Sequence, residues 1–193
     1  MSENNLQIVA FSTNETTQTP NNIISIYLEQ NNHSILKKSR SFIEFSTTLK
    51  NPPKLVKVMI YSILDLTNEY TGITNVNCYI FFIDLEKEDS NEKLDFIINY
   101  AKDFCDLTKK VFVIGMLNGN EERKHYITKD EIIKSLNTEQ FDFDYKEIKM
   151  NQLNEISDFI HEILIYSSKN AINKGYFIPS EKDGGESNSC KIF

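Results

Sequence analysis

Short apolar runs alternate with amphipathic helical patterns along most of this 193-residue chain, and this alternation limits the folds open to it. The runs at 6–11, 78–83 and 111–114 have the length and composition of buried strands, and 141–148 is predicted to contain a further short strand. Parallel strands read as continuous apolar runs because helices cover both faces of their sheet. The order of the segments therefore predicts an α/β domain with a mostly parallel sheet between two layers of helices.

Helical patterns follow the apolar runs. Pro20 matches the first position of a helix, and apolar residues then recur at helical spacing. Two later helices are predicted to begin with capping boxes, formed by Asp89 with Glu92 and by Thr128 with Glu131. The clearest apolar stripe of the chain consists of Ile156, Phe159, Ile160, Ile163 and Leu164.

Two neighbouring segments, 42–49 and 55–64, predict strands joined by a turn that contains Pro52 and Pro53. Strands joined by a short turn are antiparallel. We therefore expect a mostly parallel six-stranded sheet with one antiparallel edge strand. The periodicity stops near residue 168, so 1–168 is predicted to form the folded domain. The Gly, Ser and charged residues of 169–193 predict a flexible tail.

The composition narrows the classes of partner. Lys and Arg number 21 against 28 Asp and Glu, and the net charge of −7 argues against nucleic acid as a partner. No apolar run is long enough to span a membrane, and the N-terminal residues do not resemble a signal peptide. Three cysteines without a secretory signal favour reduced thiols in the cytosol, with Cys78 and Cys105 in the core. The three histidines show no metal-ligand spacing, so no metal site is predicted.

The last four residues are Cys190, Lys191, Ile192 and Phe193, which match the pattern that protein prenyltransferases recognise. A terminal Phe favours a geranylgeranyl group on Cys190. We expect this lipid to attach the protein to the cytoplasmic face of a membrane. The tail is not polybasic and has no second Cys, and one lipid chain usually needs a second signal. We therefore expect reversible attachment with a cytosolic pool, helped by a prenyl-binding carrier. The alternative is that a Cys stands at this position by coincidence.

The element order, the tail and the prenylation pattern together resemble the small GTPases of the Ras superfamily, the Rab type most closely. Residues 56–61 resemble the strand that leads into switch II. Residues 80–84 and 88–96 resemble the fourth strand and the helix after it, 111–115 the fifth strand, and 123–131 the start of the fourth helix. The resemblance implies a three-layer small-GTPase-like fold of the P-loop NTPase type. It also implies a role in vesicle traffic or small-GTPase signal transduction.

The phosphate-binding loop of that family is not preserved. The family motif G-x-x-x-x-G-K-[ST] holds phosphates with backbone N–H groups and a Lys, and its hydroxyl binds Mg²⁺. Residues 12–20 contain neither Gly nor Lys. Glu15 places a negative charge where the phosphates of a nucleotide would lie, which is unfavourable for binding. Thr16 and Thr17 are the remaining candidates for the Mg²⁺ hydroxyl.

The Mg²⁺ and guanine motifs depart from the family pattern as well. Ser62 stands where the family has the acid that holds Mg²⁺ through water, and Asp65 stands where it has a Gly near the terminal phosphate. Alternatively, Asp65 is the acid that holds Mg²⁺ through water, at a displaced position in the sequence. The guanine motif N-K-x-D corresponds to Met116, Leu117, Asn118 and Gly119, so its Asp is lost. We expect the first two of these side chains to cover an apolar surface.

These departures favour a membrane-anchored pseudo-GTPase that needs no cofactor and acts through effector or regulator proteins. Its contact surface is predicted at 43–49 and 64–74, and no catalytic residue is predicted. The alternative is a divergent but functional GTPase that binds GTP or GDP with Mg²⁺ through Thr17, Asn118 and backbone groups, and hydrolyses GTP. A third hypothesis is a soluble α/β interaction domain without a lipid. Whether the protein is an enzyme is left open by the sequence.

Overall fold

The computed structural model describes residues 4–12, 20–39, 42–50, 53–63, 73, 75–117 and 126–169. The strands in this part of the chain are β1 (Asn4–Ser12), β2 (Ile35–Ser39), β3 (Phe42–Lys50), β4 (Pro53–Ile63), β5 (Cys78–Asp84), β6 (Val111–Leu117) and β7 (Phe143–Lys149). The helices are α1 (Pro20–Gln30), α2 (Ser90–Phe104), α3 (Lys129–Thr138) and α4 (Leu153–Lys169). The sequence analysis predicted all of these elements except β2.

The described strands form one mixed sheet in the order β2-β3-β4-β1-β5-β6-β7. The central strand β1 pairs in parallel with β4 and β5, and the parallel arrangement continues through β6 and β7. Only β3 runs the other way, since it is antiparallel to both β2 and β4. The predicted six-stranded sheet is thus wrong in its count, because the described sheet has seven strands. The predicted antiparallel edge is present, since the edge strand β2 is antiparallel to its neighbour β3.

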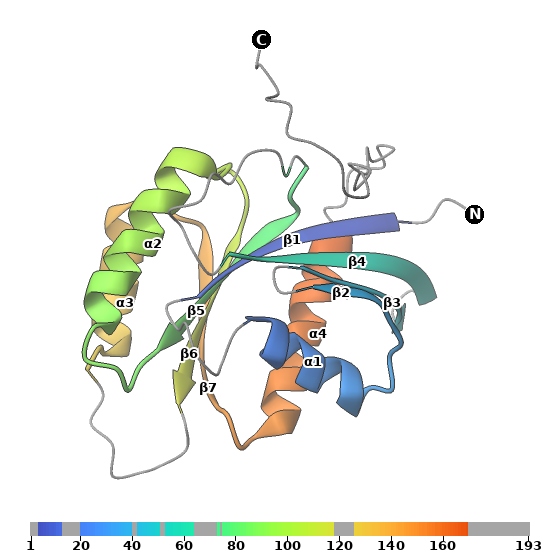
Figure 1. Ribbon diagram of the computed structural model, residues 1–193. Helices are drawn as coiled ribbons and strands as arrows, with labels where there is room; N and C mark the ends of the chain where they lie inside the picture. Colours follow the sequence, from blue (N-terminus) through green and yellow to red (C-terminus); the bar gives the residue numbers. More distant parts are fainter. Residues whose placement is uncertain are drawn as a thin grey trace, which may run out of the picture.

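Helices cover both faces of the sheet, as predicted, and give three layers (Figure 1). On one face, α1 and α4 pack over a core that contains Ile8, Ile80 and Phe112. On the other face, α2 and α3 pack over a second core that contains Phe81 and Val113. Successive residues of a strand point to opposite faces, so neighbours such as Ile80 and Phe81 enter different cores. None of the helices in the described part of the chain is long and apolar enough to cross a membrane.

The two predicted capping boxes have different outcomes. At α3, Thr128 accepts from the backbone N–H of Glu131, and the Glu131 carboxylate accepts from the backbone N–H of Thr128, which confirms the prediction. At α2, the predicted box is wrong: Asp89 is the N-cap, but its side chain makes no capping hydrogen bond. Its φ of −90° and ψ of 10° lie outside the β region typical of N-cap residues. The Asp89 carboxylate instead pairs with Lys93 at 2.9 Å.

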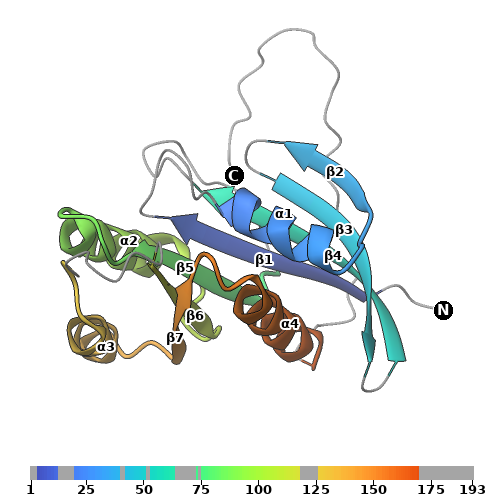
Figure 2. The ribbon, with the colours of Figure 1, turned by 90° about the horizontal axis from the view of Figure 1, so that it is seen from below.

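The end of α1 sets the position of β2. Asn32 adopts a left-handed backbone conformation with φ of 52°, which is unfavourable inside a helix. The backbone N–H of His33 then donates to the carbonyl of Leu28 at 2.9 Å and closes the helix. The chain turns directly into β2, which lies at the margin of the sheet beyond β3 (Figure 2).

Candidate functional site

The carboxyl ends of the parallel strands form the edge of the sheet where a ligand site is expected. The chain continues from β1 to the β2–β4 side of the sheet and later from β5 to the opposite side, so the strand order reverses at β1. In open α/β sheets, ligands bind outside the carboxyl ends of the strands near such a reversal. This edge is formed by Ser12, Ile63, Asp84, Leu117 and Lys149, the last residues of five strands.

Asp84 lies at the carboxyl end of β5 and is only 2% exposed. Its carboxylate Oδ1 accepts a hydrogen bond from the backbone N–H of Glu86 at 3.0 Å. The hydroxyl of Ser90, at the start of α2, donates to the backbone carbonyl of Asp84. Asp84 therefore ties β5 to the turn before α2. Burial of a carboxylate is tolerated when its oxygens are hydrogen-bonded, so this arrangement is consistent with a structural residue.

Met116 and Leu117, which the sequence analysis aligned with the first two positions of a guanine motif, are both buried. Met116 is 1% exposed and belongs to the core beneath α1 and α4, whereas Leu117 is 8% exposed and belongs to the other core. Their backbones connect neighbouring loops: the carbonyl of Met116 accepts from the N–H of Leu85, and that of Leu117 accepts from the N–H of Met150. These two side chains pack as core residues and offer no polar group to a ligand.

Gly115, just before Met116, allows the side chains of Tyr145 and Leu85 to approach the backbone of β6 closely. A Cβ atom at this position would lie 2.7 Å from the hydroxyl of Tyr145 and 2.9 Å from Cδ1 of Leu85. The Tyr145 hydroxyl also donates to Glu147 Oε1 at 3.0 Å. Burial and the nearby Glu147 raise the pKa of this phenol well above its ordinary value, so it stays protonated. Glycine is required here for packing.

Most of the remaining predicted site positions lie in parts of the chain that the structure does not describe. Glu15, Thr16, Thr17, Asp65, Asn118, Gly119 and the lipidation residue Cys190 lie outside the described ranges. The backbone of Ser62 lies in β4 opposite Ala10 of β1, while its side chain is outside the description. Of the predicted contact surface, 43–49 lies within strand β3, in which Ile43, Glu44 and Phe45 are buried, and 64–74 lies outside the described residues except for residue 73.

Two open hollows border the described residues. One, of about 550 Å³, is lined by Lys87, Glu88, Asp89 and Glu92 at the start of α2. Hydrogen bonding to Lys93 is the largest effect on Asp89 and lowers its pKa. Excess negative charge makes this hollow unsuited to phosphate or another anion.

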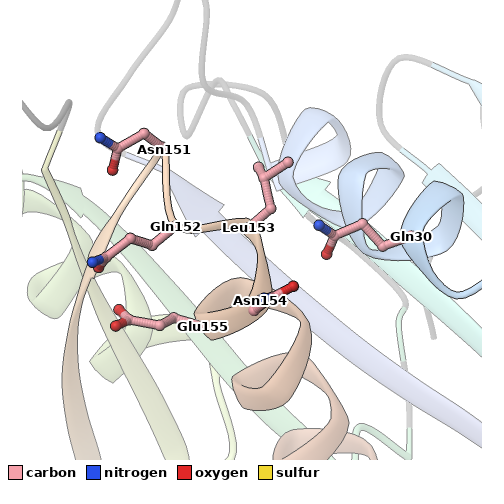
Figure 3. A pocket seen from close by; sticks show the side chains of 6 residues that line it. All are labelled: Gln30, Asn151, Gln152, Leu153, Asn154 and Glu155. Atoms are coloured by element: carbon pink, nitrogen blue, oxygen red, sulfur yellow. The ribbon is translucent and has the colours of Figure 1, made fainter.

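The second hollow, of about 460 Å³, lies between the end of α1 and the start of α4 (Figure 3). Gln30 and Asn154 extend toward each other from the two helices, whereas Gln152 and Glu155 point away from Gln30. With its amide nitrogen toward Glu155, Gln152 donates to both carboxylate oxygens at 3.0 Å. Neutral amides can form hydrogen bonds but cannot act as nucleophile or general base at neutral pH.

Burial disfavours the thiolate form of both described cysteines. Burial is the largest effect on both thiols and raises the pKa of Cys78 to about 12 and that of Cys105 to about 12. Cys78 is fully buried beside the hydroxyl of Ser167 at 3.1 Å, as predicted for a core residue, while Cys105 is only half-buried. Thiols that remain protonated at neutral pH are poor nucleophiles and metal ligands. Within the described ranges, no group of three or more His, Cys, Asp or Glu is arranged to hold a metal ion.

Two features that the sequence analysis missed lie on the β2–β4 side of the sheet. Glu44 of β3 is 5% exposed, and its Oε1 lies 2.6 Å from Nζ of Lys57 on β4. His33 Nε2 lies 3.1 Å from the hydroxyl of Thr47, and its ring stacks on Phe45. Neither pair could be found from sequence spacing. Glu44 and Lys57 meet through the register of β3 with β4, and His33, between α1 and β2, meets Thr47 of β3 only in the folded chain.

The chain matches no protein-family model and no curated protein sequence. Any inference about function therefore rests on the sequence, the fold and the described side chains.

Proposed function

We propose that this protein is a membrane-anchored, small-GTPase-like protein that acts through protein contacts without normal GTP binding or hydrolysis. Its setting would be vesicle traffic or small-GTPase signalling. The observation that carries the proposal is the combination of a compatible fold with a degenerate site. The sheet order β3-β4-β1-β5-β6-β7 with helices on both faces is compatible with a small GTPase, yet residues 12–20 lack the Gly and Lys that hold phosphates.

The buried side chains at the end of β6 support this proposal. A guanine site needs polar groups that meet the edge of the base, and Met116 and Leu117 supply apolar side chains that are packed in the two cores. A site that lacks one charged hydrogen-bond partner loses about 1.5–3 kcal/mol of binding free energy. Loss of the phosphate loop and of the guanine motif together removes most of the affinity.

A nucleotide titration separates the proposal from the alternative of a divergent GTPase. The purified full-length chain is titrated with fluorescent GDP and GTP, with and without Mg²⁺, and its nucleotide content after purification is measured. We expect no saturable binding up to high micromolar nucleotide and no bound GDP. Tight, Mg²⁺-dependent binding would instead overturn the proposal and favour the alternative of a divergent GTPase, whose hydrolysis of GTP would then be measured by phosphate release.

The membrane part of the proposal rests on Cys190 and is tested separately. The wild-type chain and Cys190→Ser are incubated with geranylgeranyltransferase and a labelled donor, and their membrane and soluble fractions are compared in cells. We expect the label and the membrane fraction only in the wild type, with a soluble pool that reflects one lipid chain and no polybasic segment. Identical labelling and fractionation of the two proteins would favour the soluble interaction domain.

A further inference from the structure

Strand β2 forms an exposed edge of the sheet. In the order of the described strands, β2 is terminal and pairs only with β3. All five of its side chains are exposed, including Ile35 at 40% and Leu36 at 52%. Figure 2 shows no described element beyond its outer side. An edge strand presents backbone N–H and C=O groups to which another extended chain can pair.

This edge is locally positive although the protein carries a net charge of −7. Its two lysines, Lys37 and Lys38, are the first basic residues of the sequence, and the strand contains no acidic residue. The Lys37 side chain is 69% exposed and lies 4.0 Å from Glu44, whose carboxylate is already held by Lys57 at 2.6 Å. Lys38 donates to the hydroxyl of Ser25 at 2.9 Å and forms no ion pair within the described residues.

The register places the two lysines on opposite faces of the sheet. Lys37 lies opposite Glu44 of β3, whereas Lys38 lies opposite Ile43, which is in the core beneath α1 and α4. An added strand has the same alternation, and residues opposite each other share a face. Two adjacent acidic residues in that strand would therefore lie near Lys37 and Lys38, one on each face. Apolar residues next to them would lie beside Ile35 and Leu36.

A second copy of this chain is a poor occupant of the edge. Pairing two β2 strands would bring two pairs of lysines together, and like charges on adjacent strands are destabilising. The β2–β3 register also shifts between Ile35 and Lys37. Bulges and lysines on edge strands discourage association between identical edges. The same lysines favour a strand of opposite charge.

We propose that β2 is the docking edge for an extended acidic segment of a partner protein, which adds to the sheet beside β2. Backbone hydrogen bonds provide the pairing, and two adjacent carboxylates that meet Lys37 and Lys38 provide the selectivity. The inference rests on the proposed function only in that the protein acts through protein contacts. It requires neither the lipid on Cys190 nor the absence of nucleotide.

Binding of designed peptides to the full-length, unlipidated chain tests this inference. The probe is a fluorescent peptide, Val-Thr-Val-Glu-Glu-Val-Thr-Val, measured by anisotropy at low salt. One control peptide has Lys in place of both Glu residues. Another keeps both Glu residues but has Pro at alternate positions, so that it carries the same charge and cannot form a ladder. We expect saturable binding of the first peptide only, with slowed hydrogen exchange of the amides in 35–39.

Matched variants locate the binding site. Lys37→Gln with Lys38→Gln should weaken binding at least about threefold, since each exposed ion pair contributes a few tenths to 1 kcal/mol. Lys129→Gln with Lys134→Gln removes the same charge from exposed positions on α3 and should leave the affinity unchanged. Equal weakening by both double variants, or equal binding of the Pro-containing peptide, would overturn the proposal because it would show general charge attraction.

Other outcomes identify a different occupant or none. Absence of binding to the wild-type chain refutes an acidic docking edge while leaving the nucleotide and lipid results unaffected. A dimer in sedimentation that the Leu36→Pro variant abolishes assigns the edge to a second copy and refutes the proposal. Tighter peptide binding after Glu181, Asp183 and Glu186 are replaced by Gln assigns the edge to these acidic residues of the chain itself, which also refutes the proposal.

Discussion

Nζ of Lys57 lies 2.6 Å from Oε1 of Glu44, and this ion pair neutralises a carboxylate that is almost completely buried between strands β3 and β4. The Lys57 side chain is itself 25% exposed, so water screens part of the attraction. Removing one member of a buried pair leaves an uncompensated charge, whereas replacing both by apolar residues is often close to neutral. The pair therefore makes the two side chains strongly interdependent.

We expect Lys57→Met to lower the free energy of unfolding by about 1–3 kcal/mol, because Lys37 at 4.0 Å is then the one cation of the described residues paired with the Glu44 carboxylate. The double variant Glu44→Leu with Lys57→Met should recover most of that loss. Urea denaturation of both single variants and the double variant measures the coupling. Lys93→Met is the matched control, because its exposed pair with Asp89 is worth less than about 1 kcal/mol. Additive effects at Glu44 and Lys57 would contradict this account.

A second prediction concerns Gly115, where neighbouring atoms leave no room for a side chain. Gly115→Ala should destabilise the protein by about 1–3 kcal/mol, since the new methyl group meets Tyr145 and Leu85 at distances below 3.0 Å. Tyr145→Phe removes the hydroxyl that lies 2.7 Å away and should recover part of the loss when combined with Gly115→Ala. Thermal and urea unfolding of the two single variants and the double variant provide the test. Destabilisation that Tyr145→Phe leaves unchanged would assign the effect to Leu85.

The central parallel strands could be predicted from sequence because their burial on both faces makes them continuously apolar. Strand β5 is buried at all seven positions, and its sequence contains a single charged residue, Asp84, at the end. Strand β2 was missed for the opposite reason. Its residues Ile-Leu-Lys-Lys-Ser are all exposed and do not alternate, so its strand conformation comes from pairing with β3. The contacts around Gly115 could not be predicted from sequence either. They depend on how β6 pairs with β7 and on where Leu85 packs after β5.

His33 provides a prediction for pH dependence. Its ring lies against Tyr27 and Phe45. Burial, with a smaller contribution from His161, lowers its pKa below the ordinary value of 6.5. The unfolded chain therefore binds a proton at a higher pH than the folded chain, so stability should fall as the pH drops from 6.5 toward the folded pKa. Above pH 6.5 this contribution is fully present.

The His33 prediction is checked by urea unfolding between about pH 5 and 8. His33→Phe retains an aromatic ring against Phe45 but cannot titrate, so it should flatten the pH dependence in this window. His161→Gln should reduce the slope only in part, because His161 is the smaller of the two causes. A slope near pH 6 that is the same in His33→Phe and in the wild type would assign the pH dependence to other groups.

The two helix starts lead to the last prediction. Thr128 and Glu131 satisfy each other's backbone N–H groups at α3, whereas the Asp89 side chain leaves the N–H groups of α2 without a side-chain cap. Thr128→Ala should therefore lower the free energy of unfolding by about 1 kcal/mol, the usual effect of losing an N-cap. Asp89→Ala should change it by less than about 0.5 kcal/mol, because only an exposed pair with Lys93 is lost. Similar losses for the two variants in urea denaturation would show that both sequence patterns cap their helices in solution.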